Sequence, residues 1–344
     1  MRKILAVDAG GTSSRAVLLD ETGACSGLGR AGGGNPTAVG IAAAVDALSL
    51  AVGRALGEDD VTSTDPDSLV VIALAGAATP PFLALLEGRL AGLGLAGRTI
   101  IEPDLLGTFC AGTAATGGYA VIAGTGAIAA RVVGGQIQTV KGGSGWLLGD
   151  TGSGFWIGQQ VARAVVASLD GLGPATALTP LLLQATGVER TSARSRGRAE
   201  ELSLLVHELY ALRPVELARF APLAFSALDP SPPDAVAHDI LDAAAVGIAQ
   251  VLAAALEPVD DTAAVPGVIV TGGSVLAAGL SRAPAIFTPP LRAAAGSTRL
   301  LPVEDGIVGA AVLAFRHLGI AVDDELHRHL TAEIDRARLR AVVA

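Results

Sequence analysis

A short pattern of apolar residues, a glycine-rich turn and a second apolar run occurs twice in this chain. The first copy spans residues 4–20, with Asp8 shortly before a turn at Gly10–Thr12. The second copy spans residues 119–133 and turns at Gly124–Gly126. Each copy predicts a strand, a tight turn and a second strand. Because one copy lies near the N-terminus and the other in mid-chain, the repeat predicts a duplicated domain that holds a polyphosphate between its halves.

The composition of these turns suits phosphate binding. Glycines let backbone N–H groups approach phosphate oxygens, a threonine hydroxyl adds a donor, and Asp8 at a strand end can hold a hydrated Mg²⁺ ion. A single copy could equally be an ordinary hairpin turn. The recurrence, together with a strand-ending glycine pair at Gly272–Gly273, favours a phosphate site. No Gly-Lys-Ser/Thr ending and no third glycine opening a helix is present, which excludes the Walker A and Rossmann motifs.

Apolar runs and helical periodicities alternate along the chain, which predicts an α/β fold. The predicted strands are residues 4–9, 15–20, 69–74, 99–101, 119–123, 127–133 and 268–270. The predicted helices are residues 38–56, 80–93, a segment opening at 104, most of 155–260, the end of 302–318 and a surface helix from 323. We expect one domain of residues 1–117 plus about 305–344, and a second of residues 118–304 with a helical insert at about 155–260.

Composition and charge narrow the possible partners. The 344 residues are 51% hydrophobic and only 17% charged, so the chain is long and apolar enough for two folded domains. A net charge of −9 argues against a nucleic acid or an anionic membrane as partner. Residues 105–130 carry no charge, but six glycines interrupt them, so we do not expect a membrane span. With no secretory segment after Met1 and no paired cysteine spacing, we expect a soluble cytoplasmic protein.

Two aspartates stand where acceptor chemistry is possible. Asp104 follows a short strand and precedes an apolar helix. It is therefore a candidate helix N-cap and a candidate general base that faces a cleft and takes a proton from a substrate hydroxyl, and one residue can be both. Asp150 lies in a glycine-dense loop, where a carboxylate can accept hydrogen bonds from sugar hydroxyls, although turn residues of this kind are also common.

Three further positions are candidates for substrate contacts. Asn35 follows three glycines and has an amide that could fix a sugar hydroxyl, but asparagine is also a standard loop residue. Gly76 follows the strand at 69–74, a place where α/β proteins position ligand loops. Trp146 could line a sugar pocket, since an aromatic ring packs on the apolar face of a pyranose. Trp156 has helical spacing and is expected in the core.

Taken together, Asp8–Thr12, Asp104, Gly124–Gly126 and Gly149–Ser153 resemble the actin/hexokinase/Hsp70 ATPase superfamily. Within it, the chain is similar to the BadF/BadG/BcrA/BcrD-type ATPases that include N-acetylglucosamine kinases. The resemblance covers roughly residues 3–160 and 265–318. It implies two ribonuclease H-like (actin-like ATPase) domains with an interdomain cleft, and the use of ATP and Mg²⁺.

The resemblance also implies a role for each matching residue. Asp104 would be the catalytic base, and Asp8 would act near Mg²⁺. The nucleotide would contact Gly10, Gly11, Thr12 and Ser13 in the first loop, Gly124, Thr125 and Gly126 in the second, and Gly272, Gly273 and Ser274 beside the adenosine. Asn35, Gly145 and Asp150 would match sugar-contacting positions.

The chain departs from the amino-sugar kinases at four positions. Thr151 replaces a glutamate, Ala127 and Ile128 replace a Ser-Asn pair, and Ser144 replaces a tryptophan that recurs two residues later as Trp146. These changes put the preference for N-acetylglucosamine over glucosamine or another hexose in doubt, but they leave the kinase interpretation intact.

The leading functional hypothesis is an ATP-dependent kinase that phosphorylates a hexose or amino sugar, N-acetylglucosamine or glucosamine, at O6. The alternative is an ATPase that activates a partner enzyme, as in the activators of 2-hydroxyacyl-CoA dehydratases. Those activators share an iron–sulfur cluster across a dimer, and here the positions of Cys25 and Cys110 argue against it. A non-catalytic regulator is a third class, disfavoured by the acidic charge. The apolar insert fits either a homodimer interface or packing on its own domain.

Overall fold

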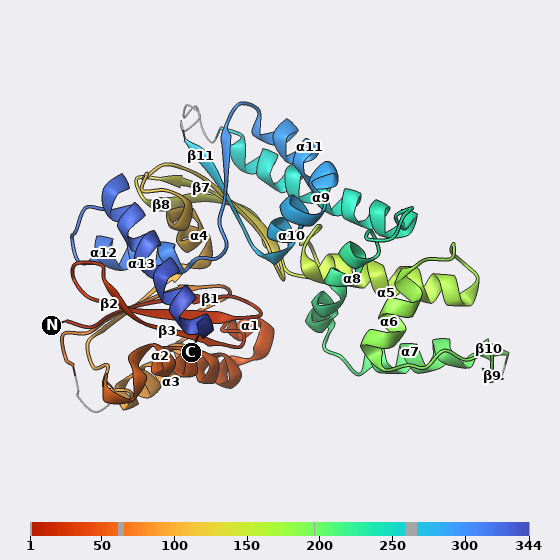
Figure 1. The fold of residues 1–344 in the computed structure, drawn as a ribbon, viewed down its shortest axis with the longest axis horizontal. Helices are drawn as coiled ribbons and strands as arrows, with labels where there is room; N and C mark the ends of the chain where they lie inside the picture. The colour runs from red at the N-terminus through yellow and green to blue at the C-terminus, as the bar shows by residue number, and fades with distance from the viewer. Residues whose placement is uncertain (1, 61–64, 196, 259–266, 344) are drawn as a thin grey trace.

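The computed structural model describes residues 2–60, 65–195, 197–258 and 267–343. It contains two five-stranded sheets, which Figure 1 shows side by side. The first has the order β3-β2-β1-β4-β5 and the second the order β12-β11-β6-β7-β8.

The strands of the first sheet are β1 (Ile4–Ala9), β2 (Ser14–Leu19), β3 (Cys25–Ala31), β4 (Leu69–Leu74) and β5 (Arg98–Pro103). Those of the second are β6 (Gly118–Ala123), β7 (Ala127–Val133), β8 (Gln136–Gly142), β11 (Val268–Gly272) and β12 (Arg299–Pro302).

The two sheets have one topology. In each, the first three strands form an antiparallel meander, and the fourth and fifth strands lie parallel to the first on its other side. This duplicated order, with helices between the sheets and on their outer faces, is that of two ribonuclease H-like domains of the actin-like ATPase type. The predicted α/β fold class is confirmed.

Helices and sheets alternate as layers. The outer face of the first sheet packs on α2 (Ile41–Asp60) and α3 (Pro80–Gly92). Its inner face and the inner face of the second sheet share one core with α4 (Asp104–Gly112), α12 (Ile307–His317) and α13 (Asp324–Val343). Residues of β1 point alternately to these two cores, as a strand buried on both faces requires. The first domain therefore rests on the second through shared helices.

The outer face of the second sheet carries the helical insert. The insert consists of α5 (Gly154–Asp170), α6 (Leu178–Thr186), α7 (Glu200–Tyr210), η1 (Pro214–Phe220), α8 (Ala221–Ser226) and α9 (Ala235–Leu256). It packs in one apolar cluster with α10 (Ser274–Arg282) and α11 (Pro284–Ala295). In Figure 1 the green part of the insert, from α5 to α7, extends away from both sheets. A short ribbon of β9 (Arg194–Ser195) and β10 (Arg198–Ala199) interrupts the predicted run of helices.

Local chemistry accounts for the differences from the sequence prediction. The helix predicted at 38–56 is two helices, α1 (Pro36–Val39) and α2, because Gly40 between them adopts a left-handed φ of 89°. Strand β8 escaped prediction because it lies at a sheet edge and its side chains alternate between exposed and half-buried.

One described helix, α9, is long and apolar enough to cross a membrane by length and composition, and half of that apolar window is buried inside the protein. The uncharged segment at 105–130 is divided among α4, β6 and β7.

Candidate active site

The two glycine-rich turns meet. A Cβ atom on Gly11 would lie only 2.7 Å from Oγ1 of Thr125, so the first turn is in van der Waals contact with the second. Each turn is closed by its own backbone hydrogen bond, 2.9 Å from Gly10 N to Ser13 O in the first and 2.9 Å from Gly124 N to Gly126 O in the second. Two segments more than a hundred residues apart in the sequence thus form one site.

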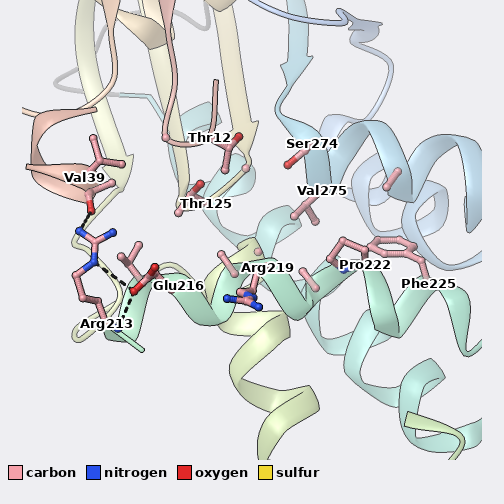
Figure 2. A pocket seen from close by; sticks show the side chains of 18 of the residues that line it. Thr12, Val39, Thr125, Arg213, Glu216, Arg219, Pro222, Phe225, Ser274 and Val275 are labelled. Carbon is pink, nitrogen blue, oxygen red and sulfur yellow. Dashed lines mark hydrogen bonds and ion pairs between the residues drawn. The ribbon is translucent and has the colours of Figure 1, made fainter. Parts of the chain in front are cut away.

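A cavity of about 550 Å³ opens beside these turns. Its size is typical of small-molecule sites. Figure 2 shows Thr12 and Thr125 above the middle of the cavity, with Val39 and Arg213 to one side and Pro222 and Phe225 of α8 to the other. The full lining is Gly11, Thr12, Ala38, Val39, Gly124, Thr125, Gly154, Arg213, Val215, Glu216, Ala218, Arg219, Ala221, Pro222, Phe225, Ser274, Val275, Ala278 and Arg282. The cavity therefore has threonine hydroxyls at the turns, the charged side chains of Arg213, Glu216 and Arg219 along η1, and apolar side chains at α8.

The glycine pair Gly272–Gly273 brings α10 to this cavity. Gly273 has a φ of 91° and lies so close to β6 that a Cβ atom would approach the carbonyl oxygen of Ala123 within 2.5 Å. Helix α10 then starts at Ser274, and Ser274, Ala278 and Arg282 on successive turns all line the cavity. Gly272 instead packs against Thr108 of α4.

Asp8 lies at the carboxyl end of β1, just before the first turn, and is almost fully buried. Its Oδ2 accepts hydrogen bonds from Gly306 N at 3.2 Å and from Arg15 Nη1 at 3.4 Å. Burial, together with the nearby charge of Asp305, raises the pKa of Asp8 to about 6 in spite of these donors.

Asp305 is a site residue that sequence reasoning missed. It ion-pairs with Arg15 Nε at 3.0 Å and with Arg338 Nη2 at 2.7 Å, so it ties the segment before α12 to β2 and to α13. The available signal was the Asp305–Gly306 dipeptide before an apolar helix, which parallels the order of Asp8 and Gly10 at the end of β1.

Asp104 is the first residue of α4, at the carboxyl end of β5. Pro103 occupies the N-cap position, and the Asp104 carboxylate accepts a hydrogen bond from the adjacent Leu105 N at 2.9 Å. The N-cap interpretation of Asp104 is therefore wrong. Burial raises the pKa of Asp104 to about 7, and the negative charge of Asp8 contributes to the rise. Asp104 is not among the residues that line the cavity, but a buried carboxylate with such a pKa near Asp8 is a candidate proton acceptor.

Asn35 and Gly76 lie together. A Cβ atom on Gly76, whose φ is 87°, would come within 2.3 Å of Asn35 Oδ1. The same oxygen caps α1 by accepting hydrogen bonds from Thr37 N at 2.9 Å and Ala38 N at 3.2 Å. The Asn35 side chain therefore caps a helix, and its NH₂ group is the part left to face a ligand.

Asp150 and Gly145 form a second group. Asp150 has a φ of 59°, the only positive φ of a non-glycine residue in the described ranges. Its carboxylate accepts hydrogen bonds from the backbone N–H groups of Ala127 and Gly145, and a Cβ atom on Gly126 would lie 3.0 Å from Oδ2. Burial raises the pKa of Asp150, and Oδ1 is buried without a partner within the described residues. A strained, under-satisfied carboxylate of this kind suits a ligand with hydrogen-bond donors.

The two tryptophans differ in exposure. Trp146 is 43% exposed, with its ring centroid 5.6 Å from that of Phe155. Trp156, on α5, is partly buried against the insert core. Of the residues that depart from the amino-sugar kinases, Ile128 packs beside Gly143, and Thr151 packs beside Gly247 of α9.

Both cysteines are buried, Cys25 in β3 and Cys110 in α4. Cys110 Sγ accepts a hydrogen bond from Arg316 Nη1 at 3.2 Å, and burial raises the pKa of each thiol to about 11. These positions do not present a thiolate to a shared metal cluster. The described part of the chain has no group of three or more His, Cys, Asp or Glu side chains arranged to hold a metal ion.

The helical insert is the largest part of the site that the sequence did not indicate. Residues of η1 and α8 line one side of the cavity, although the insert has no recognisable motif. One local signal was available, since Arg213 and Glu216 have the spacing of a capping box at the start of η1.

Comparison with known proteins places the fold in context. The sequence model of the BadF/BadG/BcrA/BcrD ATPase family matches residues 5–314. The chain is 42% identical over 67 residues to an N-acetyl-D-glucosamine kinase of Dictyostelium discoideum, a match that spans 20% of this chain and about a fifth, 21%, of that relative.

Solved structures share the fold along almost their whole length. A protein of Chromobacterium violaceum assigned as an N-acetylglucosamine kinase superposes with a TM-score of 0.65 at 24% identity, covering 91% of this chain and 99% of that one. One of Porphyromonas gingivalis with the same assignment gives 0.62 at 20% identity, with coverages of 93% and 100%. A ROK family glucokinase of Streptomyces griseus, solved with glucose and AMPPNP, gives 0.52 at 18% identity, with coverages of 91% and 99%.

Proposed function

The chain belongs to the BadF/BadG/BcrA/BcrD ATPase family, and from this premise we propose that it is an ATP-dependent kinase that phosphorylates a hexose or an amino sugar. One observation carries the proposal. The two glycine-rich turns touch at Gly11 and Thr125 beside a cavity of nucleotide size, and a carboxylate of raised pKa, Asp104, stands at the carboxyl end of β5, two strands from β1 in the same sheet. A phosphate site alone would support an ATPase, and the added proton acceptor favours transfer to an alcohol.

The cavity favours one orientation of the nucleotide. Its phosphates lie at the turns, where Thr12 and Thr125 add hydroxyl donors to the backbone N–H groups. Its base lies among the apolar side chains of Pro222, Phe225 and Val275, as Figure 2 allows. Ser274, at the first turn of α10, stands between these ends.

Magnesium fits the donor set. Mg²⁺ is commonly held by one or two carboxylates, with phosphate oxygens and water completing its shell, so a site with few protein ligands is sufficient. Asp8 is the residue that would hold it, and it would have to exchange its contact with Arg15 in doing so. The ion would neutralise charge on the transferred phosphoryl group and keep Asp8 ionised.

Asp104 acts as the general base. Its carboxylate accepts the proton of the sugar hydroxyl as the hydroxyl oxygen bonds to the γ-phosphorus, and the bond to the β,γ-bridging oxygen breaks to release ADP. Since burial disfavours the charged form of Asp104, the carboxylate binds that proton more strongly than an exposed one would.

The acceptor is held by two groups of residues. Asn35 and Gly76 lie on the first domain, and Gly145, Trp146 and Asp150 on the second. Ala127 and Ile128 offer no side-chain hydrogen bond where amino-sugar kinases have Ser-Asn, which supports glucosamine or an unsubstituted hexose as strongly as N-acetylglucosamine. O6 is the expected acceptor oxygen because it is the primary, least hindered hydroxyl of a hexose.

The test is a coupled ADP-release assay with glucosamine, N-acetylglucosamine, glucose and mannose, followed by mass spectrometry of the product. We expect one sugar to stimulate turnover strongly. Asp104→Asn should lower kcat by about 100- to 10,000-fold, the range for loss of a general base, while ATP binding measured by calorimetry is retained.

Asp46→Asn, an exposed change on α2, is the matched control. ADP release that no sugar stimulates, or full activity of Asp104→Asn, would refute the proposal.

A further inference from the structure

One hydrogen bond joins the first domain to the helical insert at the rim of the cavity. Arg213 Nη1 donates to the carbonyl oxygen of Ala38 at 3.0 Å, across 175 positions of sequence. Both residues line the cavity, Ala38 from α1 and Arg213 from the start of η1. Figure 2 shows the guanidinium group reaching from the side of Glu216 toward the segment that carries Val39. The contact therefore closes one side of the nucleotide cavity.

Arg213 is held in position for this contact. Glu216 Oε2 accepts hydrogen bonds from the Arg213 backbone N–H at 2.8 Å and from its Nε at 3.3 Å. These bonds fix the side chain and leave Nη1 directed at Ala38. The side chains of Arg213 and Glu216 are 56% and 37% exposed, so water competes for the contact and it can open easily. The Arg213–Ala38 contact spans the rim of a binding cavity, has a fixed orientation and is weak, and these are the properties of a gate.

Ala38 also connects this gate to the other substrate region. Its backbone N–H donates to Asn35 Oδ1, while its carbonyl oxygen accepts from Arg213. Helix α1 contains only four residues, so a displacement of the Asn35 side chain is transmitted to Ala38 within a single helical turn. Asn35 in turn touches Gly76. One continuous chain of hydrogen bonds therefore runs from the proposed sugar site to the rim of the nucleotide cavity.

We propose that Arg213 is a positioning residue that closes the nucleotide cavity on α1, and that through Ala38 and Asn35 it couples retention of the nucleotide to binding of the sugar. A sugar that orders Asn35 also orders α1 and favours the closed Arg213 contact, which slows release of the nucleotide before transfer. This inference rests on the proposed function for the identity of the two ligands. It adds a residue from the insert, outside the glycine-rich turns and the aspartates.

The test measures the release rate of a fluorescent non-hydrolysable ATP analogue by stopped-flow chase, with and without saturating glucosamine or N-acetylglucosamine. In the unaltered protein, we expect whichever of these sugars stimulates turnover to slow release. Arg213→Met should speed release about five-fold in the presence of the sugar, the effect of one partly exposed charge-assisted hydrogen bond. The slowing caused by the sugar should largely disappear.

Arg219→Met is the matched control. Arg219 lies on η1, the 3₁₀ helix that follows Arg213, and lines the same cavity. Its guanidinium carbon rests 5.2 Å from the ring centroid of Phe220 and makes no bond to α1 among the described contacts. This variant loses the same positive charge, so it shows any general effect of charge on the nucleotide. We expect the slowing by sugar to persist in it.

The outcomes separate the two proposals. If the unaltered protein does not bind the analogue, the proposed function itself fails. If it binds the analogue, but Arg213→Met releases it at the unaltered rate or behaves like Arg219→Met, the gate is refuted. Should Arg213→Met fold poorly, as judged by its thermal midpoint, Glu216→Gln provides the same test, because Arg213 remains and only its orientation is weakened. That variant should show an intermediate release rate, and an unaltered rate would again refute the gate.

Discussion

Asp104 is predicted to destabilise the free protein at neutral pH. Its carboxyl is buried at the start of α4 near Asp8, and both the burial and the charge of Asp8 raise its pKa from 3.8 to about 7. The fold therefore favours the protonated form. In the unfolded chain the group ionises freely, so ionisation drives unfolding as the pH rises.

The sign and size of the effect follow from the two pKa values. For a carboxyl whose pKa is raised on folding, the stabilisation is complete below about pH 4 and is lost progressively until the pH exceeds about 7. At about 1.36 kcal/mol per pKa unit, the loss between pH 5 and pH 8 is roughly 3 kcal/mol. Asp104→Asn remains neutral at every pH and can keep the hydrogen bond from Leu105 N. The variant should therefore gain stability relative to the unaltered protein as the pH rises.

The measurement is the free energy of unfolding by urea at pH 5 and pH 8, without nucleotide or Mg²⁺, for the unaltered protein, Asp104→Asn and the exposed control Asp46→Asn. The difference between Asp104→Asn and the unaltered protein should grow by about 2–3 kcal/mol between the two pH values, and the control should show no such growth. Since Asp8 contributes to the raised pKa, the change belongs to the pair. A difference that does not change with pH, or that falls, would refute the assignment of Asp104 as a buried carboxyl of raised pKa.

Three further changes test the packing that builds the site. Gly11→Ala would place a methyl group 2.7 Å from Oγ1 of Thr125 and force the turns apart. Nucleotide affinity measured by calorimetry should therefore fall about ten-fold, roughly the 1.4 kcal/mol expected of a strained contact, and unaltered affinity would contradict the contact. Gly309→Ala would bring a Cβ atom within 1.7 Å of Gly107 O where α12 crosses α4. The free energy of unfolding in urea should fall by about 2–3 kcal/mol, and an unchanged value would mean that the two helices are not in contact. Asp234 caps α9 and also accepts hydrogen bonds from Thr176 Oγ1 and Ala177 N; Asp234→Ala should cost about 2 kcal/mol or more, whereas a loss below about 0.5 kcal/mol would show that the cap is dispensable.

The repeated apolar runs were sufficient to predict the two central hairpins. Strands β1, β4 and β7 lie where the sequence predicted them, and β2 and β6 lie within one residue of their predicted positions, because strands buried on both faces read as continuous apolar runs. Strands β3, β8 and β12 were not identified. β3 and β8 are edge strands rich in polar residues and glycine, and β12 has only four residues, so no continuous apolar run marks any of them.

The site residues likewise divide into those that a local sequence pattern indicates and those that it does not. Turn residues such as Gly11 and Thr125 carry a local signature, since their chemistry depends on glycine and threonine next to strand ends. Asp305 and Arg213 carry only weak local signals, an Asp-Gly dipeptide before an apolar helix and the spacing of a capping box. Their roles come from partners distant in the chain, Arg15 and Arg338 for the first and Ala38 for the second.

The sequence by itself determined that this protein is an α/β chain with two phosphate-type turns and with Asp8 and Asp104 at the ends of two strands. These features depend on local backbone geometry and on burial of each strand, which neighbouring residues specify. Only the tertiary structure decided that the turns touch, that Asp104 is a buried carboxyl near Asp8 and not a helix cap, and that the insert forms a side of the cavity. The physical reason is that pKa values and cavity shape depend on which distant segments exclude water together, and a linear pattern does not record that.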